Sequence, residues 1–161
     1  MGKFLKMFGI WGLVFLALCL CLDLMVSSGL RRTDIRKYAV WNDIYASRID
    51  ADVIIMGSSE TWCGYNPEVI DSLLNVRSYN LAIDGHGFKY QQLRYESFRR
   101  FNPKPKLLIM NVDYPGTFDA NSGYGYEREQ FFPYITDRTL ISSVAGDKQI
   151  TWKERFIPLF R

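Results

Sequence analysis

Three short stretches of the sequence combine glycine or asparagine with side chains that could take part in catalysis. Residues 57–59 (Gly-Ser-Ser) follow the apolar run "VIIM", residues 84–87 (Asp-Gly-His-Gly) follow "YNLAI", and residues 111–113 (Asn-Val-Asp) follow "LLIM". A serine hydroxyl becomes a good nucleophile when an adjacent base accepts its proton. Backbone amides at the start of a helix can then stabilise the anion that forms. Nucleophilic attack by a serine is therefore one chemistry that these stretches could support.

Each stretch also has a purely structural explanation. Ser58 and Ser59 could be a pair of N-cap residues that accept hydrogen bonds from the first amides of a helix. Gly85 and Gly87 could supply positive φ angles. Asp113, which precedes a Tyr-Pro pair, could be a turn residue. The residue types alone leave both explanations open.

The counts of histidine and cysteine limit other chemistry. His86 is the only histidine, and of the three cysteines only Cys63 lies outside the N-terminal apolar run. A His/Cys metal cluster is therefore not expected, and we predict neither a metal nor a cofactor. We expect His86 to line a pocket or to be a turn residue, in preference to acting as the base for Ser59. Cys63 is expected to be buried.

Composition indicates one globular domain. The chain has 161 residues, of which 48% are hydrophobic and 23% are charged. Its net charge is only +3, and the basic residues are scattered without a basic stripe that interleaves with aromatics. Nucleic acid is therefore not an expected partner.

The N-terminus contains the strongest single signal. Residues 7–22 carry no charge and follow Lys3 and Lys6. This length lies between a signal-peptide core and a spanning helix. We predict an N-terminal transmembrane anchor over residues 1–29, hence a single-pass protein of the cell membrane with its domain outside the cytoplasm. A cleaved signal sequence is the alternative, because Val26 and Ser28 would fit a cleavage site before Gly29.

The remaining chain alternates between strand and helix patterns. Residues 30–50 show helical spacing of apolar side chains, which predicts a juxtamembrane helix, and residues 51–161 form the predicted domain. Within it we expect strands at residues 51–57 and 76–83, a rigid lead-in followed by a third strand within residues 103–112, and helices at residues 66–75 and 88–101. Short connections between alternating strands and helices predict an α/β fold with a three-layer arrangement around a parallel sheet. The carboxyl ends of its strands would bring the three polar stretches to one edge.

The blocks "VIIMGSSET", "YNLAIDGHG" and "PKLLIMNVDYP" resemble the SGNH/GDSL hydrolase superfamily, and more narrowly the membrane-anchored SGNH-like proteins of bacterial envelopes. The resemblance covers roughly residues 50–115 and implies an incomplete flavodoxin-like fold. It assigns the nucleophile to Ser59, with Ser58 in the place of the family's aspartate. It assigns the oxyanion hole to the amides of Ser59 and Gly85. The expected pocket-lining residues are Ser58, Asp84, His86, Asn111 and Asp113.

Two of the family's blocks depart from this pattern. Asn111 and Asp113 lie near the third block but not in its register, and the fourth block, Asp-x-x-His, is absent. An apolar cluster in residues 156–160 suggests that the sequence is the front part of a longer protein, which would supply that block. The expected function is an esterase or O-acyltransferase of the bacterial cell envelope that acts on an acylated small molecule or glycan. A non-catalytic binding or scaffolding protein is the alternative.

Overall fold

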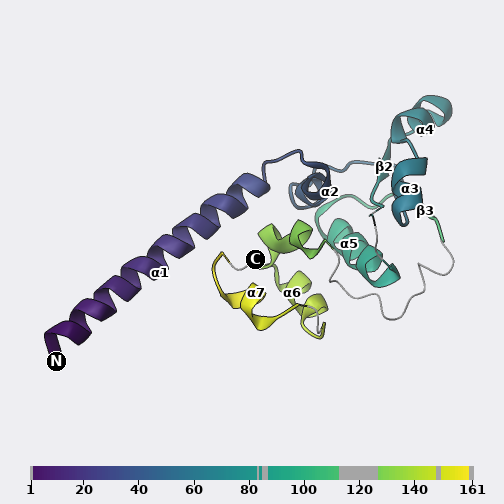
Figure 1. The fold of residues 1–161 in the computed structure, drawn as a ribbon. Coiled ribbons are helices and arrows are strands. Elements are labelled where there is room, and N and C mark those ends of the chain that lie inside the picture. The colour runs from purple at the N-terminus through teal and green to yellow at the C-terminus, as the bar shows by residue number, and fades with distance from the viewer. Residues whose placement is uncertain (1, 83, 85–86, 113–126, 148–149, 160–161) are drawn as a thin grey trace.

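The computed structural model describes residues 2–82, 84, 87–112, 127–147 and 150–159 (Figure 1). The elements are α1 (Gly2–Leu30), α2 (Arg36–Tyr45), β1 (Val53–Met56), α3 (Ser59–Gly64), α4 (Pro67–Leu74), β2 (Ser78–Asn80), α5 (Phe88–Phe101), β3 (Leu107–Met110), the 3-10 helix η2 (Arg128–Tyr134), α6 (Arg138–Val144) and α7 (Trp152–Phe156). The mixture of helices and strands confirms the predicted α/β class.

The three strands form one parallel sheet in the order β2-β1-β3. Val53 pairs with Ser78 of β2 and with Leu107 of β3, so β1 is the central strand. Each pair of strands is joined through helices, as the alternating pattern predicted. All four residues of β1 are buried, which agrees with the uninterrupted apolar run in the sequence.

The second strand is shorter than the sequence pattern suggests. We predicted residues 76–83, but β2 ends at Asn80. The amide of Leu81 still donates to Ile55 O at 2.8 Å. The side-chain oxygen of Asn80 then accepts from the amide of Ala82. The guanidinium of Arg94 donates to the carbonyl oxygens of Leu81 and Ala82. These side-chain bonds replace the strand ladder, and the strand therefore stops there.

One side of the sheet carries a dense aromatic core. Ile54 and Met56 point into it from β1, and α2, α5 and η2 cover it. The ring centroid of Trp41 lies 6.2 Å from that of Tyr90 and 6.1 Å from that of Phe131, in edge-to-face arrangements. This core holds the three helical elements together over the sheet.

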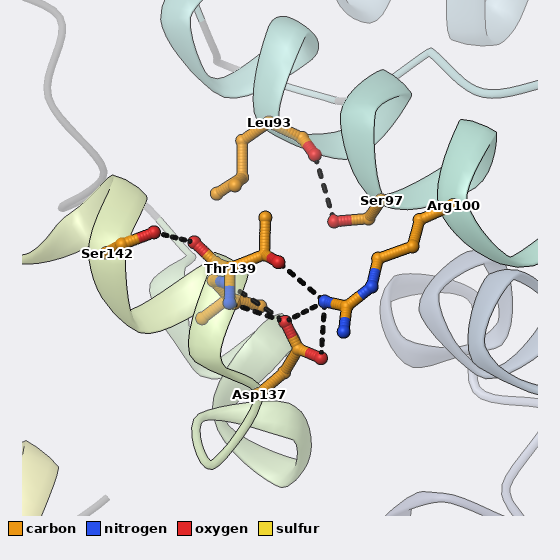
Figure 2. A network of polar contacts seen from close by, with 7 residues as sticks. Leu93, Ser97, Arg100, Asp137, Thr139 and Ser142 are labelled. Carbon is orange, nitrogen blue, oxygen red and sulfur yellow. Dashed lines mark hydrogen bonds and ion pairs between the residues drawn. The ribbon is translucent and has the colours of Figure 1, made fainter.

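Figure 2 shows how α6 is attached to α5. Asp137 caps α6 by accepting from the amides of Thr139 and Leu140 at 3.0 and 3.1 Å. The same carboxylate accepts two bonds from Nη1 of Arg100 on α5, at 3.0 and 2.9 Å. A single aspartate therefore both starts α6 and fixes it beside α5.

The helix α4 contrasts with this core. Asn66 caps it by accepting from Glu68 N at 2.9 Å, and Pro67 occupies its first turn, as the sequence indicated. None of its residues, all of which the structure describes, is buried. The exposed fractions of Leu73 and Leu74 are 76% and 66%. The predicted helix is thus present, but its apolar side is not packed.

Within the described residues, α1 is the one helix long and apolar enough to cross a membrane; a signal sequence would share these properties. Its side chains are exposed along most of its length, and it extends away from the globular part (Figure 1). Its C-terminal end is attached firmly. Asn42 on α2 donates to Leu30 O at 2.9 Å and accepts from the hydroxyl of Tyr134 at 2.8 Å, and the guanidinium of Arg31 donates to Pro133 O.

Candidate functional site

The chain turns tightly between β1 and α3. Gly57 follows the last residue of β1, and Ser59 begins α3. A Cβ atom on Gly57 would lie 1.9 Å from Oγ1 and 2.6 Å from Cβ of Thr61, and 3.1 Å from Cβ of Asn111. Only glycine therefore allows α3 to begin this close to the central strand.

The two serines of this turn have different roles. Ser58 is the N-cap of α3, and its hydroxyl accepts from the amide of Glu60 at 3.4 Å. The structural explanation offered for the serine pair thus fits Ser58. Ser59 is the first helical residue and is half-buried. Among the described residues, its hydroxyl has no hydrogen-bond partner.

The end of β2 lies beside this turn. Asn80 donates to the carbonyl oxygens of Thr61 and Tyr65 at 3.1 and 3.0 Å, which ties β2 to the C-terminal end of α3. Asp84 is half-buried in the connection that follows. Gly85 and His86 lie outside the described residues, so the predicted oxyanion amide and the histidine stay predictions.

The end of β3 contributes Asn111 to the same edge. The amide of Asn111 donates to Met56 O at 2.9 Å, so this residue continues the β1–β3 pairing up to the turn. Its side chain faces Gly57, as the 3.1 Å separation described above indicates. Asp113, the other polar residue predicted here, lies outside the described residues. The described part of the chain contains no group of three or more histidine, cysteine, aspartate or glutamate side chains that could hold a metal ion.

A buried arginine supports the end of β2. Arg94 on α5 is 3% exposed, and its Nη1 donates to Leu81 O at 3.2 Å and to Ala82 O at 3.0 Å. Its Nη2 donates to the buried Gln130 at 2.8 Å, and Gln130 in turn donates to Glu127. Burial lowers the pKa of Arg94 to about 10, and its guanidinium lies 5.3 Å from the ring centroid of Trp41. The sequence does not reveal this role, because an arginine in an amphipathic helix is usually exposed.

A small cavity of about 20 Å³ adjoins this network, enough for one water molecule. Side chains from α2, α3, α5 and η2 line it together with the connection after β2. The lining residues are Lys37, Val40, Trp62, Ala82, Asp84, Arg94, Glu127 and Gln130. The cavity therefore contains two basic and two acidic side chains. The hydrogen bond from Lys37 to Glu129, 2.7 Å long, raises the pKa of Lys37, so this lysine keeps its charge.

A larger groove of about 310 Å³ lies on the other side of Trp62. Its lining comes from α3, the start of α4 and the end of β2, and consists of Trp62, Cys63, Tyr65, Asn66, Pro67 and Asn80. Trp62 lies three residues after Ser59, and so on the same side of α3. The lining combines aromatic faces with amide groups, a combination that suits a sugar or another polar organic group. Cys63 is exposed here, so our expectation that it is buried was wrong.

The arrangement can present a serine at the start of a helix, beside a groove and a buried charged network. A scan against protein-family models, a search of curated proteins and a search of solved structures each found no match to this chain.

Proposed function

We propose that the chain is a membrane-anchored, SGNH-like esterase or O-acyltransferase of the bacterial cell envelope that acts on ester-linked acyl groups, including those on glycans. One observation carries this proposal. Ser59 stands at the carboxyl end of the central parallel strand and is the first residue of the helix that follows. In open parallel sheets, ligands bind at this edge.

The local geometry supports a nucleophilic role for Ser59 over Ser58. The hydroxyl of Ser58 caps α3, whereas the hydroxyl of Ser59 is not engaged with any described residue. The first amides of a helix have no acceptor within the helix and could stabilise an oxyanion. In α3 the amide of Glu60 is bonded to the hydroxyl of Ser58, so the amide of Ser59 itself is the proposed donor. The groove beside Trp62 would hold the acyl group or the acceptor. The helix α1 would tether the protein to the membrane.

A second candidate is a non-catalytic envelope protein that uses the same edge to bind a ligand. The observation that favours it is the hydroxyl of Ser59, which has no base bonded to it among the described residues. A serine without a base is a weak nucleophile. In this case the groove binds a glycan, and Ser59 is only a residue of the first helical turn.

Labelling with a fluorophosphonate probe separates these candidates, because the probe reacts with activated serines. The full-length protein in detergent, with the Asp-x-x-His block that the family resemblance requires, should be labelled, and Ser59→Ala should abolish labelling. Ser142→Ala is the matched control, since Ser142 is an exposed helical serine whose hydroxyl bonds to Thr139 O within its own helix. Hydrolysis of p-nitrophenyl acetate should likewise be lost in Ser59→Ala and kept in Ser142→Ala. Equal labelling of Ser59→Ala and the unmodified chain, or no labelling of either, would remove the enzymatic proposal and leave the binding protein.

A further inference from the structure

Large apolar side chains are exposed around α7. Trp152 and Phe156 lie four residues apart, hence on one side of this short helix, and are 62% and 77% exposed. Ile157 and Leu159 follow and are 37% and 44% exposed. A continuous group of exposed apolar side chains usually marks an interaction surface. The nature of its partner follows from the position of this segment in the fold.

This segment contacts α1. The amide of Leu159 donates to Oδ1 of Asp23 at 3.1 Å, and Asp23 is only 6% exposed although it lies in the apolar helix. Leu159 also lines a cavity of about 220 Å³ together with Asp23, Val26, Ser27 and Leu30 of α1. Figure 1 shows α7 on the same side of the globular part as α1, with α4 at the opposite end.

The exposed apolar surface of α1 continues beyond the level of this contact. Leu24, Met25 and Val26 follow Asp23 and are 66%, 70% and 55% exposed. A helix formed by residues 7–26 is about 30 Å long, which equals the thickness of the hydrocarbon core of a bilayer. A membrane spanned by α1 would then reach the level of Val26. The segment bonded to Asp23 would lie at its surface.

We propose that α7 and residues 157–159 form a membrane-docking surface, which inserts Trp152, Phe156 and Ile157 into the lipid interface around α1. Tryptophan is typical of this region of membrane proteins, and exposed aromatic and aliphatic side chains gain from leaving water there. The same contact covers Asp23, whose carboxylate would otherwise face lipid. The inference rests on the membrane anchor of the proposed function and is independent of catalysis.

The position of the patch favours lipid over a protein partner. The exposed side chains continue the apolar surface of α1 through the bond between Leu159 and Asp23. A bilayer that surrounds α1 would therefore meet this patch without any rearrangement. The equally exposed leucines of α4 lack this connection, because α4 lies at the far end of the globular part (Figure 1).

Spin labels on the full chain in phosphatidylcholine nanodiscs test the proposal. The three native cysteines are first replaced, by Cys19→Ala, Cys21→Ala and Cys63→Ser. Single labels are then introduced through Phe156→Cys, through Leu73→Cys as a matched control of 76% exposure on α4, and through Leu13→Cys as a reference in α1. Collisions with oxygen report lipid, and collisions with a water-soluble nickel complex report water. We expect the ratio of oxygen to nickel collision rates to be clearly higher at positions 13 and 156 than at position 73.

Three results would overturn the docking surface. A label at position 156 that behaves like the one at position 73, while position 13 reports lipid, removes the docking surface but leaves the anchor. A label at position 13 in water removes the anchor and with it this inference. A label at position 156 that neither reagent reaches shows a protein contact in place of lipid. None of these outcomes depends on esterase activity.

Discussion

The aromatic core beside α2, α5 and η2 differs sharply from the region around α4, which packs on β2. On the side of α2, α5 and η2, the side chains of Trp41, Tyr90, Phe98 and Phe131 are at most 1% exposed. On the side of α4, Val69, Leu73 and Leu74 are at least half exposed, and Leu107 of β3 is 52% exposed. The candidate nucleophile Ser59 belongs to α3, between these two environments.

This difference suggests that stability and chemistry reside in different parts of the fold. The aromatic side has the buried area that resists unfolding. The α3 side has a groove, a tight turn and exposed apolar surface. Substitutions on the aromatic side should therefore change the free energy of unfolding most. Substitutions at the turn should change the reactivity of Ser59 as well.

The largest expected effect comes from removing the central ring of the aromatic side. Trp41→Ala should lower the free energy of unfolding by about 3–5 kcal/mol, because it leaves a cavity among Tyr90, Phe131 and Arg94. Leu73→Ala on α4 is the control and should change it by less than about 0.5 kcal/mol. Urea unfolding of both variants in detergent measures this. Similar losses for the two variants would show that α4 is packed in solution and would remove the contrast.

The second effect concerns the turn before Ser59. Gly57→Ala should lower the free energy of unfolding by about 2–3 kcal/mol, because the new methyl group overlaps the side chain of Thr61, which is fully buried. It should also reduce fluorophosphonate labelling, since α3 must move to relieve the overlap.

Gly64→Ala is the matched control for this turn. Gly64 lies at the other end of α3, and a Cβ atom there would meet no described residue within 4 Å. Unfolding and labelling should both stay close to those of the unmodified chain. If Gly57→Ala were as well tolerated as Gly64→Ala, the close contact between β1 and α3 would be refuted.

The third effect concerns the buried arginine. Arg94→Met keeps much of the side-chain volume but removes the donors to Leu81 O, Ala82 O and Gln130. We expect a loss of about 1–2 kcal/mol, since unsatisfied buried acceptors are costly but a desolvated charge is also removed. Hydrogen exchange of the amide of Ala82 should accelerate, because the end of β2 loses its support. Unchanged exchange there would assign Arg94 to packing alone.

Local sequence signals predicted the positions of helices and strands better than the tertiary contacts that these elements make. Apolar runs identified β1 and β3, and Asn66-Pro67 identified the start of α4 at the residue where the structure begins it. The helix α5 ends at Phe101, directly before the Asn-Pro pair that was expected to stop it. These signals act over a few residues and do not depend on the rest of the fold.

Tertiary contacts explain what the sequence could not predict. The early end of β2 depends on Arg94, which lies 14 residues after Asn80 in the chain and whose burial no local pattern shows. The exposure of the apolar side of α4 was equally hidden, since its spacing is that of a packed helix. For the candidate site, the pattern correctly separated a strand end from the following helix. It left open whether Ser58 caps this helix, and it did not show that Trp62 lines both the small cavity and the groove.

The smallest expected effect on stability concerns the end of the sheet where the strands begin, opposite the carboxyl ends that lie near Ser59. Asp52 accepts from Nζ of Lys106 at 2.9 Å and from the backbone amide of Arg77 at 3.2 Å, so it joins the chain before β2 to the chain before β3. These bonds lower the pKa of Asp52 to about 2. Because this pKa lies below the ordinary value of 3.8, the folded chain holds fewer protons here than the unfolded chain.

The stabilising contribution of Asp52 is therefore present above about pH 4 and is lost as the pH falls through about 2. Asp52→Asn should flatten the dependence of the urea midpoint on pH in this window, and the two proteins should converge near pH 2. Lys106→Met removes the main partner of Asp52, so it should raise the pKa of this carboxyl toward its ordinary value. A carbon-13 titration of the Asp52 carboxyl measures that shift directly. Parallel pH curves for the unmodified chain and Asp52→Asn would show that backbone bonds alone hold the strands together where they begin. The carboxyl ends of the strands would then differ, because the side chain of Arg94 supports β2 there.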